Sequence, residues 1–150
     1  MKGKKISDIE NTPYLWELEG LYLGGQPTPD GIVELAARGV RQVINLRSPG
    51  EFDDAQVKSK AEELGLNYIA LPIMGANGLM AEVVAEISSL VEKESSSFVH
   101  CASGNRVAGW LIVDLVKNKG LDFEQAIEVA SSVGLTNPGF IDQAEALLDN

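Results

Sequence analysis

Short apolar runs alternate with amphipathic segments along most of this sequence, and this alternation limits the possible folds more than any other feature. Buried strands are predicted at residues 21–23, 40–46, 68–71 and 97–100. Helical patterns lie between and after these strands, and Thr28 with Pro29 is a typical helix start. Strands that alternate with helices favour an α/β fold with a mostly parallel central sheet and helices on both faces.

In such a fold, ligands bind outside the carboxyl ends of the strands. We therefore expect the loops at residues 47–54, 72–78 and 101–106 to lie along one edge of the sheet. The chain has 150 residues, and no linker divides them, so residues 1–150 are expected to form a single domain. Residues 1–13 are expected to form a loosely held arm.

The chain is acidic, with a formal net charge of −10. This charge argues against nucleic acid and against an anionic membrane surface as partners. The first residues are basic and then polar, without the apolar stretch of a secretory signal. We expect a cytoplasmic location, or a periplasmic one if a signal peptide has been removed.

Cys101 is the only cysteine, and His100 beside it is the only histidine. An internal disulfide is therefore excluded, and the residues for a structural zinc site are lacking. We expect neither a metal nor a cofactor.

The segment from Phe98 to Arg106 carries the clearest chemical signal. A strand leads to Cys101, a short loop follows (Ala102, Ser103, Gly104 and Asn105), and a helix begins near Arg106. Such a loop can point several backbone N–H groups at an anion, and the helix N-terminus adds partial positive charge. Arg106 can donate to two oxygens of a phosphate, and the same field favours the nucleophilic thiolate of Cys101. Phosphate, sulfate or vanadate is the ligand expected in this loop.

The His-Cys-loop-Arg arrangement resembles the signature of cysteine-dependent protein tyrosine phosphatases. Upstream segments at residues 23–29 (LGGQPTP) and 43–47 (VINLR) resemble the dual-specificity branch, most closely the bacterial beta-lactamase hydrolase-like phosphatases. The resemblance covers roughly residues 21–116. It implies a hydrolase for phosphomonoesters, on a small molecule or a protein, in which Cys101 attacks phosphorus and Arg106 with the loop amides stabilises the oxygens.

The resemblance also implies a general acid, for which Glu51, Asp53 and Asp54 are the candidates. The simpler interpretation makes Asp53 and Asp54 the start of a helix, and pairs Arg47 with Glu51. His100 should point away from the nucleophile and support the loop by hydrogen bonding.

Three features depart from the phosphatase pattern and keep two alternatives open. Only four residues separate Cys101 from Arg106, Val107 stands where relatives carry Ser or Thr, and residues 55–113 contain no aspartate. The six-residue segment from Cys101 to Arg106 is typical of rhodanese-like sulfurtransferases, which would act through a Cys101 persulfide. The other alternative is a phosphate-binding module without catalysis.

Overall fold

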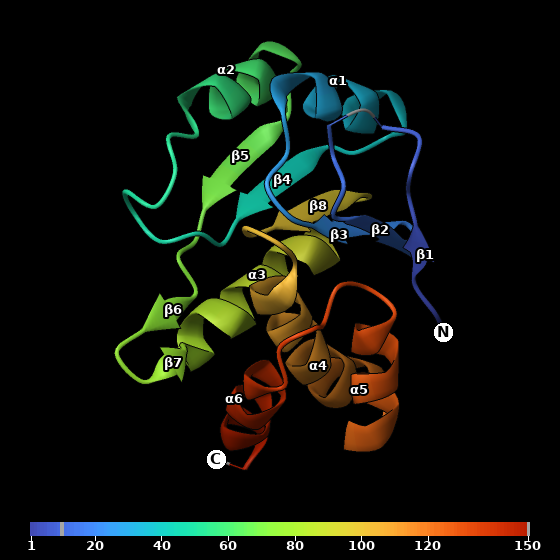
Figure 1. The fold of residues 1–150 in the computed structure, drawn as a ribbon, viewed down its shortest axis with the longest axis vertical. Coiled ribbons are helices and arrows are strands. Elements are labelled where there is room, and N and C mark those ends of the chain that lie inside the picture. Colours follow the sequence, from blue (N-terminus) through green and yellow to red (C-terminus); the bar gives the residue numbers. More distant parts are fainter. Residues whose placement is uncertain (10, 150) are drawn as a thin grey trace.

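The computed structural model describes residues 1–9 and 11–149, and within them a sheet lies between two layers of helices (Figure 1). The strands are β1 (Lys4–Lys5), β2 (Leu15–Leu18), β3 (Leu21–Gly24), β4 (Gln42–Asn45), β5 (Asn67–Ala70), β6 (Met74–Gly75), β7 (Gly78–Leu79) and β8 (Ser97–His100). The helices are α1 (Pro29–Ala37), α2 (Ala55–Glu63), α3 (Ala81–Lys93), α4 (Asn105–Lys119), α5 (Phe123–Ser131) and α6 (Gly139–Leu148). Within this described part, no helix has the length and apolar character needed to cross a bilayer.

The main sheet has the order β1-β2-β3-β8-β4-β5. Strands β3, β8, β4 and β5 pair in parallel, whereas the pairs β1–β2 and β2–β3 are antiparallel. The α/β class with a mostly parallel sheet is thus confirmed. The last residues of the parallel strands, Gly24, His100, Asn45 and Ala70, are in register, so the segments that follow them leave from one edge.

Successive side chains along the central strands point to opposite faces of the sheet and belong to two separate hydrophobic cores. On β4, Val43 packs with α1 and α2, whereas Ile44 packs against the layer of α3 to α6. On β8, Phe98 and Val99 divide in the same way. Every residue of β4 and β8 is buried, as expected for central strands covered on both faces.

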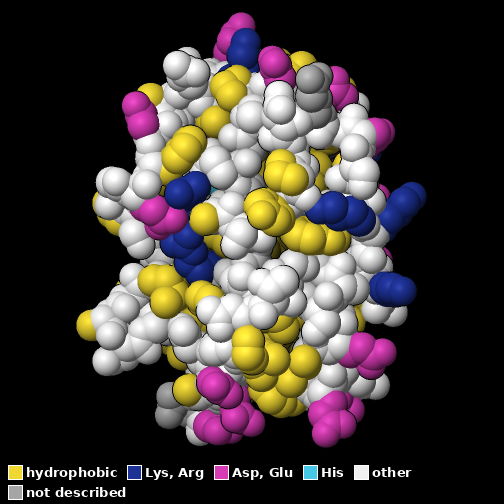
Figure 2. Space-filling model, viewed as in Figure 1, with side chains coloured by type: hydrophobic (Ala, Val, Ile, Leu, Met, Phe, Trp, Pro, Cys, Tyr) yellow, Lys and Arg dark blue, Asp and Glu magenta, His cyan; other side chains and the backbone are white. Residues whose placement is uncertain are grey.

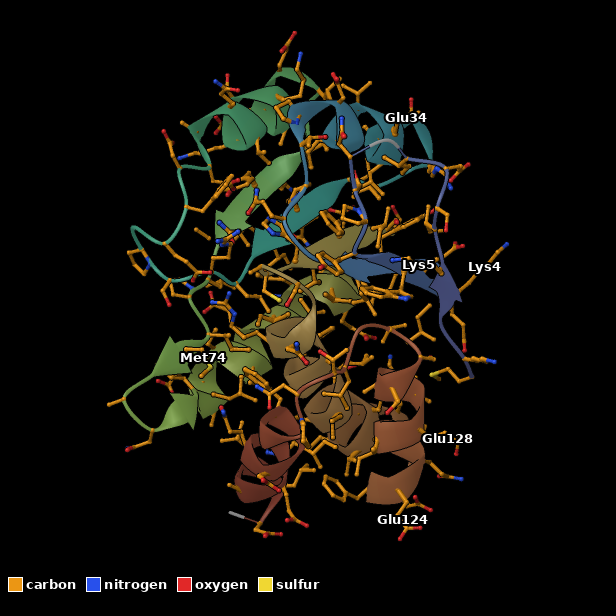
Figure 3. The ribbon with its side chains drawn as sticks, in the orientation of Figure 1. Lys4, Lys5, Glu34, Met74, Glu124 and Glu128 are labelled. Carbon is orange, nitrogen blue, oxygen red and sulfur yellow. The ribbon has the colours of Figure 1, made fainter. Side chains whose placement is uncertain are left out.

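Helix α1 begins as the sequence predicts. Thr28 occupies the N-cap, its hydroxyl oxygen accepts a hydrogen bond from Gly31 N at 3.0 Å, and Pro29 is the first helical residue. Helix α5 presents its acidic residues outward, and Glu124 and Glu128 project from the molecule in Figure 3.

The N-terminal segment differs from the expected loose arm. Strand β1 pairs with β2, and Ile6 and Ile9 are buried in the core beneath α1, with exposed fractions of 6% and 4%. The sequence signal was weak because a two-residue strand shows no periodicity, and Lys4 and Lys5 in it are exposed.

The segment after β5 also differs from expectation. Instead of an open loop at the edge of the sheet, residues 74–79 form the small hairpin β6–β7, which Gln143 of α6 joins through a hydrogen bond from Leu79 N at 2.9 Å. Met74 lies on this hairpin (Figure 3).

Candidate functional site

Cys101 lies at the point where β8 ends and the predicted loop begins. Its N–H donates to Gly24 O at 3.0 Å, which extends the pairing of β8 with β3 by one residue. Its side chain is buried, with 1% of the residue exposed, and Gly104 N donates to Sγ at 3.2 Å. At least one loop amide is therefore directed at the sulfur, where it would also face an anion bound there.

Gly104 gives the loop its turn into α4. Its φ of +107° lies in the left-handed region that favours glycine, and a Cβ there would approach the Trp16 ring to 3.3 Å. The Trp16 ring also lies close to Gly134, in the connection that follows α5, so Trp16 packs between this connection and the Cys101 loop. Helix α4 then runs for 15 residues and directs its N-terminus at the loop.

Asn105, predicted within the phosphate-binding loop, turns its side chain away from Cys101. Its Oδ1 accepts hydrogen bonds from Thr136 N and Asn137 N, both at 2.9 Å, and its Nδ2 donates to Thr136 Oγ1. The side chain therefore ties the loop to the connection between α5 and α6.

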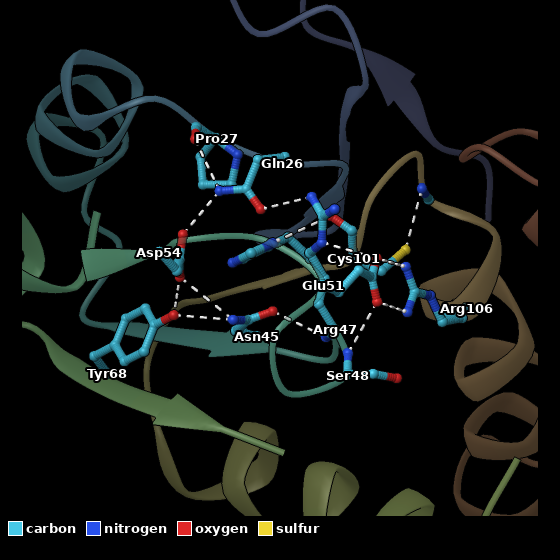
Figure 4. Close-up of polar contacts among 12 residues, drawn as sticks. Gln26, Pro27, Asn45, Arg47, Ser48, Glu51, Asp54, Tyr68, Cys101 and Arg106 are labelled. Atoms are coloured by element: carbon cyan, nitrogen blue, oxygen red, sulfur yellow. Dashed lines mark hydrogen bonds and ion pairs between the residues drawn. The ribbon is translucent and has the colours of Figure 1, made fainter. Parts of the chain in front are cut away.

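Arg106 meets Glu51 in a two-pronged ion pair (Figure 4). Its Nη1 and Nη2 donate to Oε1 and Oε2 at 2.8 and 2.7 Å. Arg47 Nε donates to Oε2 at 2.9 Å, and Ser48 N donates to Oε1 at 3.0 Å. Glu51 thus lies between two arginines beside the Cys101 loop. One of these two contacts is the predicted pairing of Arg47 with Glu51.

This contact changes the acid–base properties of both partners. The hydrogen bonds from Arg106 lower the pKa of Glu51 to about 2, and those to Glu51 raise the pKa of Arg106. Glu51 is therefore ionised at neutral pH and carries no proton to donate.

Gln26 connects the Cys101 loop to the segment after β4, which leaves from the same edge of the sheet. Its N–H donates to Ala102 O at 3.1 Å, its Oε1 accepts from Arg47 Nη1 at 3.0 Å, and its Nε2 donates to Asp54 Oδ1 at 2.8 Å. Gly25 beside it has no room for a side chain, because a Cβ would come within 2.5 Å of Ala102 O. The backbones of the β3 connection and the Cys101 loop are consequently in close contact.

Asp54 accepts hydrogen bonds from Gln26, Asn45 and Tyr68. Burial raises its pKa. Asp54 occupies the N-cap of α2 without capping it by its side chain, whereas Asp53 Oδ1 accepts from Ala55 N at 3.1 Å. The pKa of Asp54 is thus raised, whereas that of Glu51 is lowered.

His100 is fully buried and stacks on Phe98, with ring centroids 5.3 Å apart. Its Nδ1 lies 3.3 Å from Cys101 O, and no hydrogen-bond partner for Nε2 is found among the described residues. Burial lowers the pKa of His100 to about 4, so the ring is neutral at pH 7. His100 therefore contacts the backbone at the start of the Cys101 loop through Cys101 O.

Three residues of this network were absent from the predicted site: Gln26, Asn45 and Tyr68. Each lies on or just after a strand that ends at this edge, which was the available signal. Although the net charge is −10, Lys and Arg side chains lie at the left and right of the middle of the face shown in Figure 2, and most of its Asp and Glu side chains lie above and below.

A separate cavity of about 360 Å³ lies at the opposite edge of the sheet, at the amino end of β8. Its lining includes Ser97, Glu19, Glu92 and Asp114. Since these carboxylates would repel a phosphate, the cavity is a poor match to the chemistry of the Cys101 loop. Among the described residues, no three His, Cys, Asp or Glu side chains form a group that could hold a metal ion.

Comparison with known proteins identifies sequence relatives of this chain. The family described as "DSP-PTPase phosphatase fused to NAD+ Kinase" matches residues 11–140. A beta-lactamase hydrolase-like protein of Xylella fastidiosa (strain 9a5c) is 37% identical over 93 residues, which are 59% of this chain and 21% of that protein. One from Agrobacterium fabrum is 33% identical over 92 residues, with the same coverage. The match thus takes in about a fifth of the length of these curated relatives.

Solved structures share the fold at lower identity. TpbA of P. aeruginosa, in complex with pTyr, superposes with a TM-score of 0.74 at 17% identity and covers 97% of this chain and 86% of that one. PTPMT1 superposes with a TM-score of 0.65 at 18% identity, covering 86% of this chain and 94% of that one. Since the family match spans most of the sequence and this fold agrees with it, the chain belongs to the DSP-PTPase phosphatase family whose description includes fusion to an NAD+ kinase.

Proposed function

We propose that this phosphatase domain hydrolyses phosphomonoesters through a covalent phosphocysteine at Cys101. The observation that carries the proposal is the placement of Sγ beside the Gly104 amide at 3.2 Å, at the N-terminus of α4 and next to Arg106. The kinase associated phosphatase KAP, which shares the fold at a TM-score of 0.70 and 16% identity, is described as having a catalytic site cysteine. Family membership and fold both support the same role for Cys101.

The proposed reaction has two displacements at phosphorus. In the first, the Cys101 thiolate forms an S–P bond while the P–O bond to the leaving group breaks and its electron pair departs with the alcohol oxygen. In the second, water attacks phosphorus, the S–P bond breaks, and inorganic phosphate leaves with the thiolate restored. Arg106 and the loop amides would stabilise the charge on the three equatorial oxygens in both steps.

We propose Asp54 as the proton donor to the leaving group. Its raised pKa supports this choice, whereas Glu51 is held ionised by Arg106 and Asp53 caps α2 from an exposed position. Tyr68 and Asn45 would orient the Asp54 carboxyl group through their hydrogen bonds.

A second candidate function is sulfur transfer through a Cys101 persulfide. The short loop favours it, because only four residues separate Cys101 from Arg106 and a shorter loop forms a smaller cradle, which suits a persulfide better than a tetrahedral phosphoryl group. Sulfur would pass from thiosulfate to Sγ with release of sulfite, and then from Sγ to cyanide. Thiocyanate formation and a mass gain of one sulfur on Cys101 would identify this activity.

The deciding experiment is hydrolysis of p-nitrophenyl phosphate at mildly acidic pH by the wild type and by Cys101→Ser. We expect turnover that vanadate inhibits and that the substitution abolishes. Retained turnover by a folded Cys101→Ser protein would overturn the phosphocysteine route. Vanadate that raises the melting temperature without any turnover would indicate a binding module instead.

A further inference from the structure

The carboxylate of Glu51 fills an anion-binding cradle built from other parts of the protein. We define the Arg cradle as the side chains of Arg47 and Arg106 with the N–H of Ser48. Oε2 accepts from Arg47 at 2.9 Å and Arg106 at 2.7 Å, and Oε1 accepts from Arg106 at 2.8 Å and Ser48 at 3.0 Å. A carboxylate has about four acceptor positions, so the Arg cradle satisfies an oxyanion completely.

The arginine side chains of the Arg cradle are less exposed to solvent than the carboxylate that they bind. The side chains of Arg47 and Arg106 are 13% and 15% exposed, whereas that of Glu51 is 27% exposed. Gln26 Oε1 accepts from Arg47 Nη1 at 3.0 Å and anchors this guanidinium independently of Glu51. If Glu51 turned into the solvent, two largely buried cations would remain, and buried cations need an anionic partner.

Arg106 can serve the Arg cradle and the Cys101 loop at once. A guanidinium has five N–H donors, and Glu51 uses one on each terminal nitrogen. Nε–H and one further N–H on each terminal nitrogen remain for a phosphoryl group over Cys101. Two anion sites would therefore share one arginine, and Figure 4 shows Arg106 beside both Cys101 and Glu51.

We propose that the Arg cradle is a second oxyanion subsite, which Glu51 occupies in the free protein and a carboxylate or second phosphoryl group of the substrate occupies in the complex. This inference rests on the proposed function and narrows its substrate class to phosphomonoesters that carry another anionic group a few bonds away. Glu51 lies between β4 and α2 in a loop outside helix and strand, where Gly50 has a φ of +79°. The exchange thus requires a loop rearrangement and leaves the sheet intact.

Calorimetric binding of three small probes tests the subsite without requiring turnover. Methylphosphonate carries one oxyanion, phosphonoacetate adds a carboxylate, and methylenediphosphonate adds a second phosphonate. We expect at least one of the two-anion probes to bind wild type tenfold or more tightly than methylphosphonate, and the better probe identifies the second group. Arg47→Met should reduce this preference to about twofold or less. Arg41→Met is the matched control for charge, because Arg41 lies at the amino end of β4, and it should leave the preference intact.

The substitution Glu51→Gln distinguishes two possible roles of Glu51: either it occupies the subsite in the free protein, or it only positions Arg106. A neutral amide competes less well for two guanidinium groups, so the preference for two-anion probes should increase about fivefold. An equal loss of affinity for all three probes in Glu51→Gln would mean that Glu51 only positions Arg106, and would overturn the subsite. Equal binding of the three probes to wild type would also overturn the subsite but leave the proposed phosphatase site standing. Failure of all three to bind wild type would overturn both.

Discussion

Arg106 and Glu51 face each other end on, with both terminal nitrogens of the guanidinium donating to the two carboxylate oxygens at 2.8 and 2.7 Å. The residues are 55 positions apart in sequence, one on the first turn of α4 and the other in the loop after β4. The pair therefore couples the Cys101 loop to the neighbouring strand connection, and Arg47 strengthens it from the other side.

The Arg106–Glu51 pair should contribute measurably to stability. A double-mutant cycle with Glu51→Gln and Arg106→Met, followed by urea unfolding, should give a coupling free energy of about 1–2 kcal/mol, since both side chains are mostly buried. The exposed Lys60–Glu63 pair is the control, and it should give about 0.5 kcal/mol or less. Equal coupling in the two cycles would contradict this view of the pair.

Gly104 should be needed for both stability and anion binding. Gly104→Ala places a side chain at a φ of +107° against Trp16, and we expect a cost of about 1–3 kcal/mol in unfolding free energy together with weaker vanadate binding. Gly120 ends the same helix at a φ of +74° with open space around it. Gly120→Ala should destabilise to a similar or smaller extent and leave vanadate affinity unchanged, so equal losses of affinity would argue against a special role for Gly104.

His100 should make stability fall in mild acid. Its pKa is about 4 in the folded protein and 6.5 in the unfolded chain, so below pH 6.5 the unfolded state binds a proton that the folded state does not. We expect a loss of roughly 1.5 kcal/mol in unfolding free energy between about pH 6.5 and pH 5. Because His100 is the only histidine, His100→Gln should flatten the profile in this window, and an unchanged profile would assign the loss to other groups.

Asp54 and Asp53 should differ in their effect on leaving groups. If Asp54 donates the proton, Asp54→Asn should slow hydrolysis of phenyl phosphate about tenfold more than that of p-nitrophenyl phosphate, whose leaving group needs less protonation. Asp53→Asn should change neither rate appreciably, since Asp53 caps α2 at an exposed position. A similar reduction for both substrates in Asp54→Asn would mean that Asp54 serves only to hold Tyr68, Asn45 and Gln26.

The parts of the fold that depend on local pattern were predictable from the sequence. Strand β8 was predicted with the bounds that the structure gives, and the predicted start of α4 near Arg106 differs from the observed one by a single residue. These predictions succeeded because apolar runs, helix starts and glycine turns act over a few neighbouring residues. Strand β1 was missed because backbone pairing with β2, and not a side-chain pattern, holds it in place.

The sequence by itself determined that Cys101 and Arg106 flank one loop between a strand and a helix, since six consecutive residues cannot separate far in space. It also supplied the residues Gln26, Asn45, Arg47, Glu51, Asp54 and Tyr68, but not their arrangement. Only the tertiary structure decided that Glu51 meets Arg106 and that Gln26 links Ala102 to Asp54. The physical reason is strand register: parallel pairing of β3, β8, β4 and β5 brings distant segments to one edge, and this pairing depends on long-range backbone hydrogen bonds.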